Sequence, residues 1–178
     1  MRQIFVLTTF LCSTAFAGQA MQALPPMPEL AKISFLAGKW TGNLKVYGMG
    51  PNPVPCKATL VGNKTLDNRY IQTNHTMDMG ENGKMQGMFL ASYDQLKKQY
   101  VAFWFDSSAP SVMEMRGNFQ GTSLIMVSKP VEVPGMPGPM TMRTTFTKKS
   151  NSQYDFKLES KEGDKWTPMI VGGYRKTG

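Results

Sequence analysis

Histidine and cysteine are scarce in this sequence, and the scarcity excludes most catalytic and metal-binding templates. Among 178 residues, His75 is the single histidine, and Cys12 and Cys56 are the two cysteines. Paired histidines at metal spacing, a Gly-x-Ser-x-Gly elbow, a phosphate-binding glycine loop and a dinucleotide fingerprint are all missing. We therefore expect a binding protein more than an enzyme, and we expect no cofactor.

Long apolar runs are also missing, because no segment stays apolar over the ~20 residues that a membrane-spanning helix needs. Residues 1–17 instead have the features of a secretory signal peptide. Arg2 is followed by a short apolar run at 4–11, and residues 15–17 (AFA) fit a small-x-small cleavage site. We expect cleavage near Ala17, a periplasmic or secreted protein, and no stable membrane insertion.

Basic residues outnumber acidic ones but are not gathered into a patch. Twenty Lys and Arg against twelve Asp and Glu give a formal net charge of +8. They are scattered, apart from short pairs at 97–98 and 148–149, and aromatic residues do not alternate with them as on nucleic-acid-binding surfaces. A solvated surface accounts for this charge, and no nucleic-acid partner is expected.

Helix signals are few, and strand signals dominate. Residues 18–28, with consecutive prolines, predict an extended tether, and 29–36 predicts one short helix ending near Gly38. Ten later runs are rich in β-branched and aromatic residues and are separated by turn signals. These runs are 39–47, 56–66, 69–79, 85–93, 99–107, 111–119, 122–133, 140–149, 153–160 and 165–176.

Short turns between these runs favour antiparallel neighbours, since parallel strands need long crossover connections. Ten strands would twist strongly, and closing the sheet removes its exposed edges. We therefore predict an all-β fold over residues 29–178, a single antiparallel up-and-down barrel of about ten strands with the short helix capping one end. A two-sheet sandwich is the alternative.

The stretch "FLAGKWTGNLKV" places Gly38-Lys39-Trp40 at the start of the first strand, after the short helix. It resembles the Gly-x-Trp signature of lipocalins and other calycins. In those barrels the tryptophan closes one end and packs on an arginine near the end of the last strand. The resemblance implies this structural pairing for Trp40 and Arg175.

More of the chain, over roughly 29–176, resembles the bacterial domain-of-unknown-function 1579 family of calycin-like barrels. The matching pieces are "LAGKWTG", "RYIQTNHTMDM", "MQGMFLASYDQLKKQYVAFWFDSSA", "MRGNF" and "VGGYRK". The resemblance implies the barrel fold but no activity, since the family's function is uncharacterised. The chain is more distantly similar to nitrobindin-like haem barrels. Their haem-ligating histidine lies late in the chain, and here no histidine follows His75.

A ten-stranded barrel is wider than an eight-stranded one, whose side chains just fill its interior, and so it tends to leave a cavity. Methionine and aromatic side chains suit an adaptable apolar lining. We therefore predict a binding site for a small apolar or amphipathic molecule. Its candidate residues are His75, Met77, Phe103, Phe105, Met113 and Met115.

The hairpin "IQTNHTMDMGENGKMQGMF" offers a second hypothesis, a soft-metal site. His75, Met77 and Met79 alternate on one strand, and Met85 lies just past the turn. Thioether and imidazole ligands suit Cu(I). The competing interpretation is that these methionines fill gaps in the core, as the fifteen methionines of the chain suggest.

A third hypothesis is an enzyme of unknown reaction, such as an isomerase or hydrolase, that uses Asp106, Glu114 or His75. Asp106 ends one predicted strand, while Glu114 and Arg116 share a face of the next, so the three could meet inside the barrel. The alternative is an ion pair on the outer surface, worth at most ~1 kcal/mol.

Overall fold

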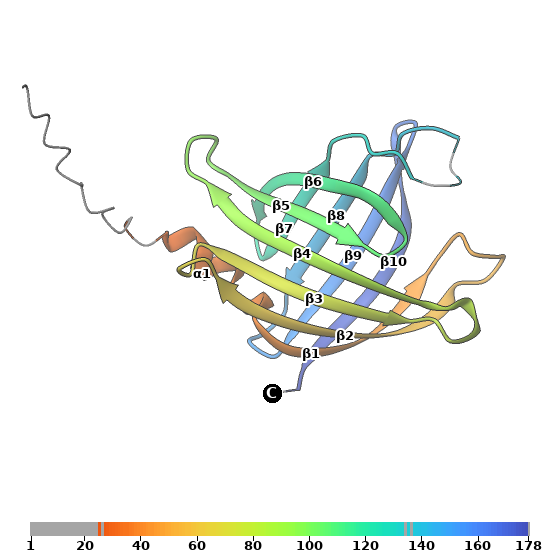
Figure 1. Cartoon of the computed structure of the whole chain (residues 1–178), viewed down its shortest axis with the longest axis horizontal. Helices are drawn as coiled ribbons and strands as arrows, with labels where there is room; N and C mark the ends of the chain where they lie inside the picture. Colours follow the sequence, from red (N-terminus) through yellow and green to blue (C-terminus); the bar gives the residue numbers. More distant parts are fainter. Residues whose placement is uncertain (1–24, 26, 134, 136, 178) are drawn as a thin grey trace, which may run out of the picture.

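The computed structural model describes residues 25, 27–133, 135 and 137–177, in which antiparallel strands close into one barrel (Figure 1). Neighbours in the sequence are neighbours in the sheet, and the last strand pairs with the first. The predicted up-and-down barrel is confirmed. Its strands are β1 (Gly38–Val46), β2 (Val54–Thr65), β3 (Tyr70–Asp78), β4 (Lys84–Asp94), β5 (Gln99–Asp106), β6 (Ala109–Gln120), β7 (Ser123–Ser128), β8 (Met142–Lys148), β9 (Gln153–Glu162) and β10 (Lys165–Lys176).

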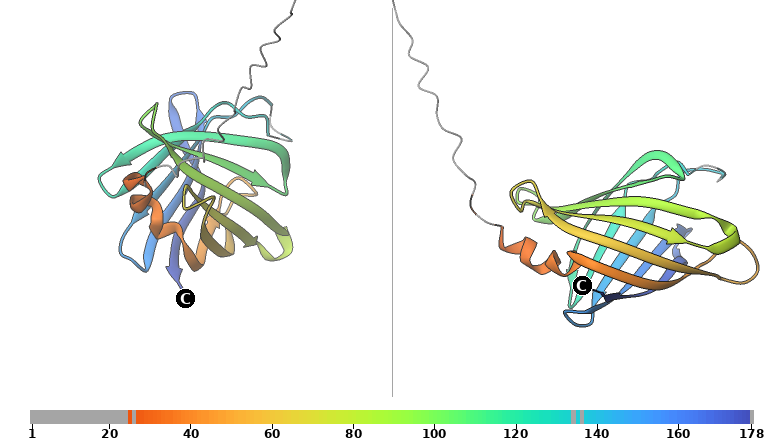
Figure 2. Two further views of the ribbon diagram at one scale, coloured as in Figure 1. Left: turned by 60° about the vertical axis from the view of Figure 1, so that its left-hand side comes forward. Right: turned by 60° about the horizontal axis from the view of Figure 1, so that its bottom comes forward.

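A short helical segment closes one end of the barrel, which we call the closed end (Figure 2). The predicted helix is two pieces, α1 (Pro28–Ile33) and the 3₁₀ turn η1 (Ser34–Leu36). Proline suits the first turn of α1, because the N–H that it lacks would have no partner there. Ile33 and Leu36 are buried, and the Tyr100 hydroxyl donates to the Glu29 carbonyl at 2.9 Å, which ties the helix to β5. In the residues that the structure describes, no helix is long and apolar enough to cross a membrane.

Strict alternation decides which side chains face the interior. Along β3, Ile71, Thr73, His75 and Met77 are buried, while the residues between them are more exposed. The small helical turn η2 (Gly80–Asn82) then leads into β4. Side chains along a strand alternate between the two faces of the sheet. The register of the strand therefore decides which residues face the interior and which face the solvent.

The connection between β7 and β8 differs from the prediction. A strand was expected to continue to residue 133, but β7 stops at Ser128. The segment that follows is rich in proline and glycine, and in its described residues, 129–133, 135 and 137–141, Val131 and Met140 form an isolated bridge. Proline supplies no N–H to a ladder, which explains the early end of the strand.

The first and last strands meet in a seam next to the closed end. Trp40 is 1% exposed and packs edge-on against Tyr154, with ring centroids 4.9 Å apart. The predicted contact between Trp40 and Arg175 is wrong. Lys176 lies opposite Trp40, with its Nζ 5.6 Å from the ring centroid, because Tyr174 points inward and Arg175 must therefore point outward.

The predicted signal peptide (1–17) and most of the predicted tether (18–28) lie outside the described residues. Helix α1 begins at Pro28, the last residue assigned to that tether.

Candidate functional site

A cavity of about 230 Å³ lies at the end of the barrel opposite α1, which we call the open end. Its inner wall comes from seven strands, and its rim from the β5–β6 turn and the β7–β8 loop. Ser108 and Ala109 lie in the wall at that turn, and Val131, Glu132 and Val133 lie there on that loop. At the closed end, the described side chains of Trp40, Tyr154 and η1 pack together in the interior.

Thioethers form a large part of the cavity wall. They come from β3, β4, β6, β8 and β10, so they surround the cavity instead of lying on one strand. Met77 and Met85 are direct cross-strand partners. The lining methionines are Met77, Met85, Met113, Met115, Met142 and Met169.

Aromatic rings form the rest of the apolar wall. Phe89 and Phe146 pack with centroids 5.4 Å apart, and Phe146 lies at the same distance from Phe156. Tyr174 joins this group from β10, and its hydroxyl faces an apolar setting that raises its pKa by desolvation. Such rings and flexible thioethers present a surface that can adapt to an apolar molecule.

His75 is a polar group in this wall, and it is 9% exposed. Its Nε2 lies 2.8 Å from the Thr73 hydroxyl oxygen, and its ring meets Trp104 edge-on at 5.1 Å between centroids. Burial without a compensating acidic partner lowers the His75 pKa to about 4. The imidazole is therefore neutral near pH 7, with one ring nitrogen that donates a hydrogen bond and one that accepts.

Trp104 occupies its place because Gly87 leaves room for it. A Cβ on Gly87 would lie 2.3 Å from the indole of Trp104, closer than any side chain could tolerate. The indole Nε1 donates to the Asp106 carboxylate at 2.6 Å. Asp106 also accepts from the backbone N–H groups of Ser108 and Ala109 at 2.8 and 3.0 Å, so it shapes the rim of the cavity.

The predicted ligand-binding residues divide between the two faces of the barrel. His75, Met77, Met113 and Met115 lie in the cavity wall. Their role in binding a ligand stays a prediction.

Placing Phe103 and Phe105 in the cavity is wrong. On β5 the inward row is Tyr100, Ala102 and Trp104, so the phenylalanines between them face outward and pair with Leu90 and Met88. The sequence "YVAFWF" is apolar on both faces and gives no alternation from which to choose.

The proposed soft-metal ligands are partly brought together. His75, Met77 and Met85 share the cavity wall, whereas Met79 follows the end of β3 and packs against the core outside the wall. Cys56 is 2% exposed, and its burial raises the pKa of its thiol.

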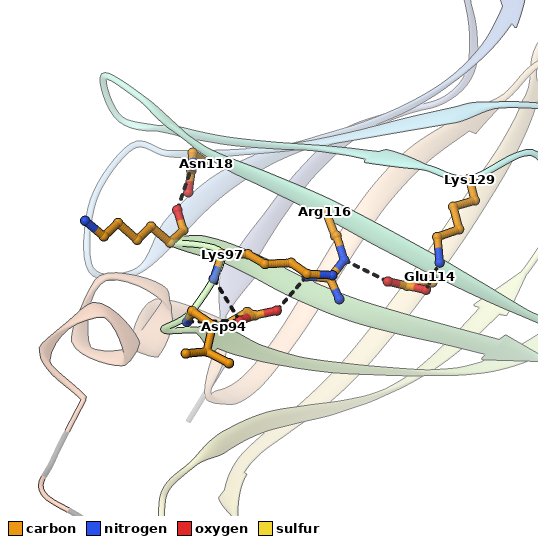
Figure 3. A network of polar contacts seen from close by, with 8 residues as sticks. Asp94, Lys97, Glu114, Arg116, Asn118 and Lys129 are labelled. Carbon is orange, nitrogen blue, oxygen red and sulfur yellow. Dashed lines mark hydrogen bonds and ion pairs between the residues drawn. The ribbon is translucent and has the colours of Figure 1, made fainter.

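Asp106 and Glu114 do not meet, which corrects the third hypothesis. Asp106 lines the cavity, while Glu114 lies on the outer face of β6. There Glu114 accepts from Arg116 at 2.7 Å and from Lys129 at 2.6 Å, and Arg116 reaches Asp94 at 2.9 Å (Figure 3). Lys129, together with Arg116, holds the pKa of the Glu114 carboxyl below its usual value. Glu114 and Arg116 therefore form an ion pair on the outer surface, as the alternative interpretation predicts, and Asp106 takes no part in it.

Sequence reasoning missed several residues of the wall, above all Trp104, Phe89, Phe146 and Tyr174. One signal was available for Trp104. Gly87 and Ala102 are small residues among bulky ones, and small residues on neighbouring strands indicate the face where a large ring is accommodated.

Several solved structures share this architecture. Rv2717c from M. tuberculosis superposes with a TM-score of 0.64 at 9% identity, covering 86% of this chain and 100% of its own. The S-type phycobiliprotein lyase CPES from Guillardia theta superposes with a TM-score of 0.53 at 8% identity, covering 86% and 99%. At these identities the likeness shows the calycin-like fold.

No curated protein matches the sequence. A family described as "Protein of unknown function (DUF1579)" matches residues 26–176, nearly the whole barrel together with its helix. The chain therefore belongs to the DUF1579 family.

Proposed function

We propose that this protein is an exported binding protein that holds a small apolar or amphipathic molecule in the open-end cavity. The observation that carries the proposal is the cavity itself, about 230 Å³ of space walled by thioethers and aromatic rings. A barrel interior that was only a core would be filled, because protein cores pack as densely as organic crystals. The lyase with the same barrel fold supports the proposal, since this fold is compatible with small-ligand binding.

The wall suggests what kind of molecule fits. Ligand pockets commonly measure about 300–1,000 Å³, so this cavity suits a small ligand. Polar groups gather at the rim, where Asp106, Ser108 and Glu132 lie, and His75 is a neutral polar group in the wall. A ligand with an apolar body and one polar end at the rim matches this distribution.

Export is part of the proposal and rests on the sequence of residues 1–17, with their basic start, apolar run and small-residue cleavage site. The test is N-terminal sequencing of the protein purified from its own host, together with cell fractionation. We expect a mature chain that begins near Gly18 and is found outside the cytoplasm. An uncleaved chain in the cytoplasmic fraction would overturn this part.

Binding is tested with two substitutions at neighbouring positions on β6. Met113 lines the cavity, whereas Val112 is 49% exposed on the outer face. Met113→Trp should fill the cavity and weaken binding of the neutral fluorescent probe N-phenyl-1-naphthylamine at least ~10-fold, while Val112→Trp should leave it unchanged.

Native mass spectrometry of protein from its own host should show a bound small molecule in wild type and less of it in Met113→Trp. A wild-type protein that is empty from its host and does not bind the probe would overturn the proposal.

A further inference from the structure

Two of the cavity methionines lie beside the only histidine of the chain. Met77 and Met85 pair directly across β3 and β4, and opposite residues in such pairs have Cβ atoms about 4.5–5.5 Å apart. His75 precedes Met77 by two positions on the same face, about 6.6–6.8 Å along the strand between Cα atoms. Long thioether side chains can reach across such distances, so these three residues, which all line the cavity, can converge on one corner of it.

The His75 ring is held in one orientation by its neighbours. Its Nε2 contacts the Thr73 hydroxyl at 2.8 Å, and Trp104 packs against the ring, so its rotation is restricted. In metal sites one ring nitrogen commonly donates to a neighbouring group, which fixes the tautomer and leaves the other nitrogen as a ligand. Here a donating Nε2 would leave Nδ1 as the nitrogen that can bind a ligand.

We propose that His75, Met77 and Met85 form a binding site for Cu(I) at this corner of the cavity. Neutral imidazole and thioether donors match a soft monovalent ion, and they need lose no proton to bind it. Two carboxylates at the rim, Asp106 and Glu132, give an entering cation a favourable electrostatic approach.

Harder ions lack comparable donors. Among the residues that the structure describes, no group of three or more His, Cys, Asp or Glu side chains could hold a metal ion. The thioethers are therefore what distinguishes this corner, and the chemistry that they select is that of soft metals. The Cu(I) site is distinct from the binding of an apolar molecule, and the two can be tested separately. Replacing the two methionines with another apolar residue removes the sulfur donors and keeps the cavity wall apolar.

The test is an anaerobic Cu(I) titration against the chromophoric competitor bathocuproine disulfonate. Wild type should retain one equivalent of Cu(I), and Met77→Leu/Met85→Leu should bind it at least ~100-fold more weakly. Even the loss of an outer supporting contact weakens metal sites about 10–100-fold. The matched control is Met49→Leu/Met88→Leu, at two positions outside the cavity wall. It should bind Cu(I) like wild type.

Leucine conserves volume, so the double variant should still bind N-phenyl-1-naphthylamine, which separates this proposal from the one above. X-ray absorption of the wild-type complex should show both sulfur and imidazole scattering. That measurement decides the matter even if the variant fails to fold. Unchanged Cu(I) affinity in Met77→Leu/Met85→Leu would overturn the proposal. So would copper lost only in Cys56→Ser, or spectra without sulfur.

Discussion

At the scale of single residues, His75 should make stability depend on pH. Burial lowers its pKa from 6.5 to about 4, so the unfolded chain binds more protons between these values. The contribution of the neutral ring is fully present above pH 6.5 and is lost as the pH falls toward 4. From pH 7 to pH 5 we expect the free energy of unfolding to decrease by about 2 kcal/mol through this group, at 1.36 kcal/mol per pKa unit.

The measurement is urea unfolding at pH 7 and pH 5, with a chelator present to keep the protein free of metal. His75→Gln should remove this part of the pH dependence and leave the rest as in wild type. If the free energy of unfolding fell by the same amount between pH 7 and pH 5 in wild type and in His75→Gln, the burial of an uncharged His75 would be contradicted.

Gly87 is the second residue that determines the shape of the site, because its missing side chain leaves room for Trp104. A Cβ there would lie 2.3 Å from Trp104, so Gly87→Ala must push the indole away from His75 and from Asp106. Overpacking of this kind typically costs 1–3 kcal/mol. We expect a lower urea midpoint and a changed tryptophan emission, measured in a Trp166→Phe background in which Trp40 is the second emitter and is the same in both proteins. Gly138→Ala is the control, because a Cβ at Gly138 has no neighbour within 4 Å. Unchanged emission in Gly87→Ala would show that Trp104 has other room.

At the scale of elements, the seam between β1 and β10 should depend on Trp40. The ring is buried and packs on Tyr154, so Trp40→Ala should cost about 3–5 kcal/mol of unfolding free energy. Lys176→Ala should cost far less, since this side chain is exposed, and Arg175→Ala should be nearly silent, because it points outward. Urea unfolding of the three variants measures these costs. A cost for Arg175→Ala larger than that for Lys176→Ala would contradict the observed register.

The ion-pair network on the outer face of β4–β6 should contribute through charge alone. Arg116 lies between Asp94 and Glu114, and Lys129 completes the chain of charges. Arg116→Leu should lower the urea midpoint at low salt, and the loss should shrink in ~1 M NaCl, where the Debye length is about 3 Å. Lys45→Leu, an exposed position on β1, is the control. A loss that does not change with salt would point to packing of the arginine stem instead.

At the scale of the whole molecule, the two ends of the barrel should differ in local stability. The closed end is filled by Trp40, Tyr154 and η1, whereas the open end surrounds a cavity. Amide hydrogen exchange should therefore be slow in the strand segments around Trp40 and Leu60 and faster at the rim of the cavity, in residues 129 and 131–133. A bound apolar molecule should slow exchange at the open end alone. Uniform protection along the strands would contradict this difference.

The sequence allowed the barrel to be predicted because ten short runs with short turns leave few other ways to bury an apolar face. It predicted the cavity wall less well where alternation was absent. On β3, polar and apolar residues alternate around His75, so the sequence predicted which face of the sheet carries its side chain. On β5, Phe103, Trp104 and Phe105 are all aromatic, and only the pairing of β5 with β4 and β6 decides which ring faces inward. The depth of the cavity depends on packing across the barrel, which no local pattern encodes.

The pairing of the first strand with the last also affects the chain while it is being synthesised. β1 is made first, but its partner β10 is made last, so one edge of β1 waits for most of the chain to appear. At about 5–20 residues per second, that wait is on the order of ten seconds. Alternate positions of β1 are exposed, and two of them, Lys39 and Lys45, are lysines. Edge lysines hinder pairing with foreign strands, so the nascent strand carries its own protection against aggregation until the ring of strands closes.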